Sequence, residues 1–286
     1  MIVIFLINYY ISVLTCRILE QEKIMKDYTD FIIDASEWQA NRPRFYIDQL
    51  MPNSTSDYGV IGGRWQKFKT NLSLELLASL ATGDDFFGLK VEQIPVVFLD
   101  FEGNPVNISE RVMKILRHHS TPSPGYLNLS NLKDKRFILH DNINRLIDEV
   151  KGAKLALIDG TKHLMGGEYL KPAKIKELGE DLLKAMNKGK FCAVVTWQVK
   201  KPHEETLITP GDLNSLKGAA DLVEDATFAL LLEQPPSKPL GKGKWLHPPE
   251  YWVNLYVGKA KEASQEFAEP YMELEFDRTN CQFKIR

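Results

Sequence analysis

The chain has 286 residues, enough for one large hydrophobic core with appended segments. Hydrophobic residues make up 44% of it and charged residues 26%, which excludes a disordered or fibrous protein. The net charge is -2, so any contact with nucleic acid must come from a local basic patch. The 3 cysteines are far apart and include no Cys-x-x-Cys pair, which argues against a disulfide framework or a structural zinc site and favours the reducing cytoplasm.

The first 16 residues, MIVIFLINYYISVLTC, form an apolar run. The run is shorter than the ~20 residues of a membrane-spanning helix, and it lacks the basic start and the cleavage site of a secretory signal. Three interpretations remain: a membrane-associating anchor, a terminal element packed on the core, or an extension upstream of a true start at Met25. We divide the chain into an N-terminal extension (1–24), a lead-in segment (25–44) and one domain (45–286), and we expect no stable membrane association.

From residue 58 onward the hydrophobic pattern alternates between strands and helices. Residues 58–62 form a short apolar strand, and leucines at helical spacing predict a helix over residues 70–81. Further helices are predicted at residues 109–118 and 172–188. Unbroken apolar runs, which predict parallel strands covered on both faces, occur at residues 96–99, 155–158 and 192–195. This order predicts an α/β fold with a mostly parallel central sheet and helices on both faces.

The C-terminal part continues the sheet in a different style. Residues 228–232 predict another buried strand, and residues 251–257 and 271–276 predict antiparallel strands at its end. Residues 235–249 are rich in proline, glycine and lysine, which predicts a loop or hairpin. The lysines of this segment with Trp245 have the composition of a single-strand contact, although a solvated loop explains them equally well.

Residues 63–70, Gly-Arg-Trp-Gln-Lys-Phe-Lys-Thr, lie between the first strand and the first helix. A P-loop needs this place, where backbone N–H groups and a helix N-terminus cradle phosphates. The pattern GxxxxGK[ST] fits except that Phe68 replaces the second glycine, so its side chain must point away from the nucleotide. We expect an ATP site in which Lys69 holds the β- and γ-phosphates. The predicted nucleotide-contacting residues are Gly63, Arg64, Trp65, Gln66, Lys67, Phe68, Lys69, Thr70 and Asn71.

Carboxylates follow two of the apolar strands. Asp159 ends one strand at the carboxyl edge of the sheet, where it can hold Mg²⁺ together with Thr70. Glu102 lies just beyond the strand at 96–99 and is the candidate general base toward an attacking water. We interpret the neighbouring Asp100 as a solvated or helix-capping carboxylate. We interpret the pair His118-His119 as solvated at a helix end, where cations suit the helix dipole, and not as a metal site.

The loop at 63–71 occurs together with ATG at residues 81–83, LDFEG at 99–103 and LID at 157–159. In these motifs, and over roughly residues 45–285, the chain resembles the RecA-like ATPases grouped with RepA-type and DnaB-type hexameric helicases. The resemblance implies a RecA-like P-loop fold, the cofactors ATP and Mg²⁺, a ring-shaped homo-oligomer (a hexamer in that family) and single-stranded DNA as partner.

The resemblance also implies roles for residues beyond the P-loop. Gln198 stands where the family places a sensor of the γ-phosphate, and Lys200 and Lys201 begin the loop that faces DNA. Lys261, in Lys259-Ala-Lys261, matches the arginine that reaches the nucleotide of the neighbouring subunit, although lysine cannot form a bidentate fork. Trp197 either faces nucleic acid or is a buried aromatic residue.

These observations predict an ATP-hydrolysing RecA-like motor, a DNA helicase or replication protein that acts on single-stranded DNA. Two alternatives stay open. A regulatory or assembly protein that binds nucleotide with little hydrolysis is favoured by Phe68 and Lys261. A recombination or repair ATPase would form open filaments in place of closed rings.

Overall fold

The computed structural model describes most of the chain beyond residue 43. The described residues belong to one compact unit, Arg44–Arg286, and are 44–53, 58–63, 68–133, 137–166, 171–198, 216, 220–235, 238–241, 244–246, 248–260 and 270–286. The predicted extension at 1–24 and the lead-in segment up to residue 43 lie outside them. No helix among the described residues is long and apolar enough to cross a membrane.

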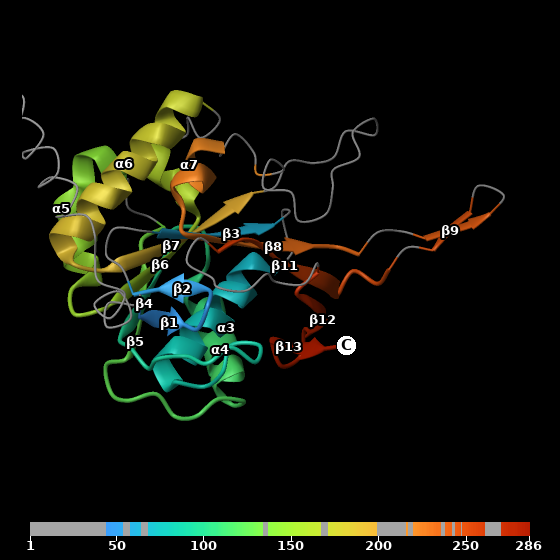
Figure 1. Cartoon of the computed structure of the whole chain (residues 1–286). Helices are drawn as coiled ribbons and strands as arrows, with labels where there is room; N and C mark the ends of the chain where they lie inside the picture. Colours follow the sequence, from blue (N-terminus) through green and yellow to red (C-terminus); the bar gives the residue numbers. More distant parts are fainter. Residues whose placement is uncertain are drawn as a thin grey trace, which may run out of the picture. The chain divides into compact units, whose positions relative to one another are not determined.

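The described strands form one nine-stranded sheet and two small hairpins (Figure 1). In spatial order the sheet contains β13 (Gln282–Ile285), β12 (Met272–Asp277), β11 (Trp252–Ala260), β8 (Phe228–Glu233), β3 (Tyr58–Gly63), β7 (Cys192–Gln198), β6 (Leu155–Asp159), β4 (Val96–Asp100) and β5 (Leu127–Asn131). The strands from β8 to β5 are parallel, and β11 to β13 are antiparallel. This architecture confirms the predicted α/β fold with antiparallel strands at its C-terminal end.

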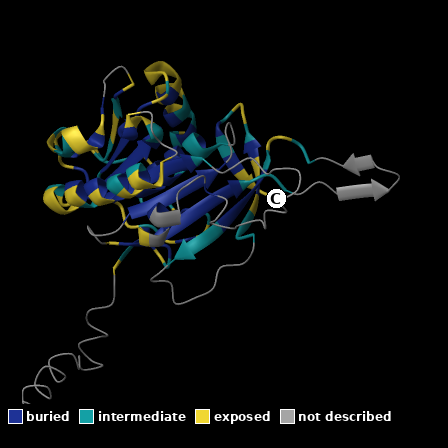
Figure 2. Ribbon diagram, turned by 90° about the horizontal axis from the view of Figure 1, so that it is seen from above, coloured by how far each residue is buried: buried dark blue, intermediate teal, exposed yellow. Residues whose placement is uncertain are grey.

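Helices cover both faces of the sheet, which explains why its central strands are apolar without alternation. The helices are α3 (Lys69–Thr82), α4 (Pro105–Leu116), α5 (Leu139–Val150), α6 (Pro172–Gly189) and α7 (Ala220–Asp225), with the 3₁₀ turn η1 (Thr161–Met165). Along β4, Val96 and Phe98 pack in the cluster that holds α3 and α4, whereas Val97 and Leu99 pack in the cluster that holds α5 and α6. Figure 2 shows the buried strands between helices that expose their outer faces.

The two hairpins lie outside the main sheet. β1 (Phe45–Ile47) pairs with β2 (Met51–Pro52), and β9 (Lys238–Gly241) pairs with β10 (Lys244–Leu246). The second pair confirms the hairpin interpretation of residues 235–249.

Three elements were not predicted from the hydrophobic pattern. β5 reads LNLSN and has exposed residues at the edge of the sheet, and α5 reads LHDNINRLIDEV with a kink at Asn142, so neither carries a long apolar run. β13 is a strand of 4 residues. The predicted helix at 109–118 begins earlier, at Pro105, because the side chain of Asn104 caps it by accepting a hydrogen bond from the Val106 N–H at 2.9 Å.

His119 joins the end of α4 to α3, and the prediction of a solvated pair is wrong for this residue. Its Nε2 lies 3.0 Å from Glu75 Oε1 and its Nδ1 lies 3.3 Å from Asp84 Oδ2, with 7% of the side chain exposed. His118 is exposed. Burial alone would lower the pKa of His119, but the hydrogen bond to Glu75 and the charges of Glu75 and Asp84 raise it above its ordinary value.

A raised pKa in the folded state means that protonated His119 stabilises the fold below its unfolded pKa, and that this contribution is lost as the pH rises through the folded pKa. We expect His119→Gln to lower the free energy of unfolding by about 2 kcal/mol near pH 6, the scale of a charge-assisted hydrogen bond, and by less at about pH 9. Urea unfolding at both pH values measures this, with exposed His118→Gln as control. An equal loss at both pH values would contradict the assignment.

Candidate nucleotide-binding site

A cavity of about 520 Å³ opens at the carboxyl edge of the sheet, where the parallel strands end. The pairing of strands sets this edge: Asp100 of β4 is the register partner of Asp159 of β6, and Gly63 of β3 is the partner of Gln198 of β7. The described residues that line the cavity are Phe68, Lys69, Thr70, Asn71, Glu102, Arg111, Asp159, Gly160, Thr161, Lys162, Thr196, Trp197, Gln198, Phe276, Arg278 and Cys281. Most of the residues predicted to bind nucleotide within the described segments therefore meet at one place.

The described part of the phosphate loop consists of its two ends, Gly63 and the residues from Phe68 onward. The four predicted contacts between them, Arg64, Trp65, Gln66 and Lys67, lie outside the described residues. Lys69 begins α3, and a Cβ atom on Gly63 would lie 2.9 Å from Lys69 Cγ, so the glycine leaves room for the lysine side chain. Burial lowers the pKa of Lys69, while the carboxylates of Asp159 and Glu102 oppose this shift.

Phe68 occupies the N-cap position of α3 in a left-handed conformation, with a φ of 56°. Such a backbone suits glycine and costs a phenylalanine about 1–2 kcal/mol. The ring packs on the C-terminal strands: its centroid lies 4.2 Å from that of Phe276 and 6.4 Å from that of Phe283. The position that departs from the P-loop pattern thus has a packing partner of its own, three strands away from β3 in the sheet.

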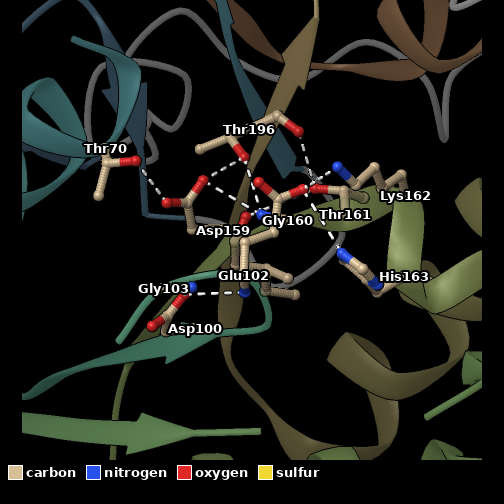
Figure 3. Close-up of polar contacts among 11 residues, drawn as sticks. Thr70, Asp100, Glu102, Gly103, Asp159, Gly160, Thr161, Lys162, His163 and Thr196 are labelled. Carbon is tan, nitrogen blue, oxygen red and sulfur yellow. Dashed lines mark hydrogen bonds and ion pairs between the residues drawn. The ribbon is translucent and has the colours of Figure 1, made fainter. Parts of the chain in front are cut away.

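Asp159 receives hydrogen bonds on both carboxylate oxygens (Figure 3). Thr70 Oγ1 donates to Oδ2 at 2.6 Å, and Thr196 Oγ1 donates to Oδ1 at 2.7 Å. The backbone N–H of Gly160 also reaches Oδ1, at 3.1 Å. Burial raises the pKa of Asp159, although the bonds from Thr70 and Thr196 work in the other direction. Thr196 was not predicted, since its only signal in the sequence is a hydroxyl group in an otherwise apolar strand.

The pair of Thr70 and Asp159 has the chemistry of a magnesium site. A hydroxyl and a carboxylate are hard oxygen ligands of the kind that Mg²⁺ binds beside nucleotide phosphates. A cation next to the buried carboxylate would favour its charged form, which burial disfavours. The residues at this edge therefore fit the metal that the P-loop pattern implies.

Asp100 is neither solvated nor a helix cap, so that interpretation is wrong. It is 2% exposed, and its Oδ1 accepts the backbone N–H groups of Glu102 at 3.0 Å and Gly103 at 2.7 Å. Its Oδ2 accepts a hydrogen bond from Asn131 Nδ2 at 2.8 Å. With these donors Asp100 closes the turn that presents Glu102 to the cavity (Figure 3).

Glu102 lines the cavity and forms an ion pair. Its Oε1 lies 2.7 Å from Lys162 Nζ and 3.6 Å from His163 Nε2, and 38% of its side chain is exposed. Both partners follow Asp159 on η1 (Figure 3) and were missed from the sequence. The run DGTKH gave a signal for them, because cations directly after a strand-ending carboxylate must lie at the same edge of the sheet.

The remaining predicted residues divide between described and undescribed parts of the chain. Gln198 ends β7 and lines the cavity, and Trp197 is 6% exposed and packs in the core, as in the buried-aromatic interpretation. Lys200, Lys201 and Lys261 lie outside the described residues. Arg111 of α4 is an additional basic residue of the cavity that was not predicted; its Nη1 lies 3.5 Å from Asn71 Oδ1.

Comparisons with known proteins agree with this geometry. The family model described as "AAA domain" matches residues 21–204, more than half of the chain. No curated protein matches the chain. Among solved structures, the ATPase domain of a DnaB-like helicase superposes with a TM-score of 0.55 at 13% sequence identity, over 80% of this chain and 84% of that one. The fold is therefore shared with an ATPase domain, and the chain belongs to the AAA domain family, as a RecA-like P-loop protein of the helicase-type ATPase class.

Proposed function

We propose that the protein is an Mg²⁺-dependent ATPase that works as a ring-forming motor on single-stranded DNA. The observation that carries the proposal is the convergence of Lys69, Thr70, Asp159, Glu102 and Gln198 on one cavity at the carboxyl edge of a RecA-like sheet. This set combines a cation for the phosphates, oxygen ligands for a metal, a candidate base and a polar group that can respond to the γ-phosphate.

Lys69 supports the binding step. It begins α3, so its ammonium group and the N-terminal N–H groups of the helix offer positive charge to the same phosphates. Thr70 and Asp159 would hold Mg²⁺, which neutralises charge on the phosphate oxygens when it is bound. The hydroxyl of Thr70, which donates to Asp159 at 2.6 Å, is already placed beside the carboxylate that shares this task.

Glu102 supports the hydrolytic step. Asp100 has hydrogen bonds on both of its oxygens, which leaves Glu102 as the carboxylate beyond β4 that is exposed to the cavity. A proton taken from an attacking water would go to an oxygen of Glu102. Lys162 pairs with that carboxylate at 2.7 Å, and phosphates bound near Lys69 would offer Lys162 a second anion.

One observation favours a second candidate function. A carboxylate held by Lys162 at 2.7 Å is a weaker base than one without a cation beside it. If this ion pair persists with nucleotide bound, the protein would bind ATP and hydrolyse it slowly, as a regulatory or assembly protein would. Steady-state ATP hydrolysis with and without single-stranded DNA separates the two functions, because only a motor is stimulated by DNA.

We expect Lys69→Ala to abolish measurable ATP binding while the protein stays folded, because the variant loses the buried cation that faces the phosphates. Calorimetric titration with MgATP measures the affinity, and circular dichroism checks the fold. Lys90→Ala is the matched control, since Lys90 is 81% exposed and pairs with Asp85. Unchanged affinity in Lys69→Ala would remove the P-loop assignment.

We expect Glu102→Gln to bind ATP normally and to hydrolyse it about 10²-fold more slowly, the usual loss when a positioned base is removed. Glutamine still accepts a hydrogen bond from Lys162, so the surroundings of residue 102 should be kept. Phosphate release under steady-state conditions gives the rate, with exposed Glu110→Gln as control. A rate equal to that of the parent protein would show that another group activates the water.

The DNA part of the proposal rests on the loop that begins with Lys200 and Lys201, directly after Gln198. Replacing both lysines with alanine should weaken single-stranded DNA binding, reduce its salt slope by up to about two units and erase DNA stimulation of hydrolysis, while basal hydrolysis survives. Fluorescence anisotropy with a labelled oligonucleotide at two salt concentrations measures both quantities. Equal affinity and equal slope in the variant and the parent would mean that this loop does not contact DNA.

A further inference from the structure

We propose that Phe68 is a positioning residue: its ring fastens the β12–β13 hairpin to the phosphate loop, and the hairpin places Arg278 against the nucleoside part of ATP. The inference rests on the proposed function, because it assumes that the cavity binds a nucleotide whose phosphates face Lys69. It assigns a task to the residue at which the chain departs from the P-loop pattern.

The contact between the loop and the hairpin is aromatic. Phe276 and Phe283 are cross-strand partners on β12 and β13, with ring centroids 5.0 Å apart. The ring of Phe68 lies 4.2 Å from Phe276 at an interplanar angle of 32°, and 6.4 Å from Phe283 nearly edge-on, at 88°. Phe87, after α3, adds a fourth ring 6.2 Å from Phe283. Offset and edge-on arrangements are favourable aromatic geometries, so the residue just before Lys69 is attached to the C-terminal strands.

The turn of the hairpin is held by its own hydrogen bonds. Asp277 Oδ1 accepts the backbone N–H groups of Thr279 at 2.9 Å and Asn280 at 3.2 Å, and its Oδ2 accepts from Lys284 Nζ at 3.0 Å. Cys281 completes the turn in a left-handed conformation, with a φ of 55°, and is 8% exposed. A turn closed at both ends gives Arg278 a fixed backbone position.

Arg278 comes from this turn and lines the cavity together with Phe276 and Cys281. Its side chain is 65% exposed, and its only ion pair among the described residues is a contact of 3.4 Å with Glu250, which is itself 79% exposed. A guanidinium group in this place can donate to ribose and base acceptors or stack on the base plane. A solvent-exposed ion pair is weak, so it does not prevent such a contact.

The order of strands decides which part of the nucleotide meets the hairpin. β6, with Asp159, lies on one side of β3, and β12 lies on the other side, beyond β8 and β11. Lys69, Thr70 and Asp159 therefore take the phosphates between β3 and β6. The cavity wall made by the hairpin is left for the ribose and the base, and the ring of Phe68 joins the two regions.

The experiment compares MgATP with magnesium tripolyphosphate, which has the phosphates but no nucleoside, by calorimetric titration of the full chain. We expect Phe68→Gly to weaken ATP binding about tenfold or more and to leave the tripolyphosphate affinity within about twofold. Phe68→Tyr, which keeps a ring, should retain the ATP affinity. Arg278→Ala should also weaken only ATP, and Arg286→Ala, which removes the same charge from a residue outside the cavity lining, should weaken neither ligand.

The double variant Phe68→Gly/Arg278→Ala tests whether Phe68 acts through Arg278. We expect it to bind ATP no more weakly than the weaker single variant, because each change removes the same contact. Equal weakening of both ligands by Phe68→Gly, additive effects in the double variant, or an unchanged ATP affinity would each overturn the role of Phe68. Failure of the parent protein to bind either ATP or tripolyphosphate would refute the nucleotide site itself, a different result from any of these.

Discussion

The buried carboxylate of Asp159 is the group on which the rest of the site depends. It ends β6 at 7% exposure and takes hydrogen bonds from Thr70 of α3, from Thr196 of β7 and from the Gly160 N–H. A buried carboxylate without donors would cost several kcal/mol, so the two hydroxyl groups are needed wherever this charge is kept. Because its partners come from three elements, the carboxylate also fixes the start of α3 relative to the two strands beside it.

The turn after β4 follows the same rule by other means. Asp100 sits level with Asp159 in the neighbouring strand, but its oxygens close the turn of its own chain and accept a bond from Asn131. Two buried carboxylates side by side thus do different work: one aligns elements around the phosphate loop, and the other shapes the backbone that carries Glu102. Glycine is required in this turn, because a Cβ atom on Gly103 would lie 2.5 Å from Asp100 Oδ2.

The sequence predicted the parallel strands and the edge at which the candidate residues gather, since long apolar runs that end in polar residues leave few alternatives. It failed where an element is short, polar or at an edge, as in β5, because such a strand forms through its neighbour and not through its own pattern. The partners of predicted groups were also beyond it. That Lys162 pairs with Glu102, or that His119 bridges Glu75 and Asp84, depends on side chains that meet only after folding. Phe68 shows the same limit: the motif predicted that its side chain must leave the phosphate site, but the ring's destination is set by Phe276 and Phe283, far along the chain.

The edges of the nine-stranded sheet have a consequence for how copies of the chain can meet. Among the described residues, the outermost strands are β13, with 4 residues and an exposed lysine, and β5, with 5 residues and three polar side chains. Short edges with polar or charged side chains are poor templates for adding a strand from another molecule. Association of this domain with its own copies is therefore steered away from sheet extension and toward side-chain surfaces on helices and loops, which can separate and rejoin without unpairing a backbone ladder.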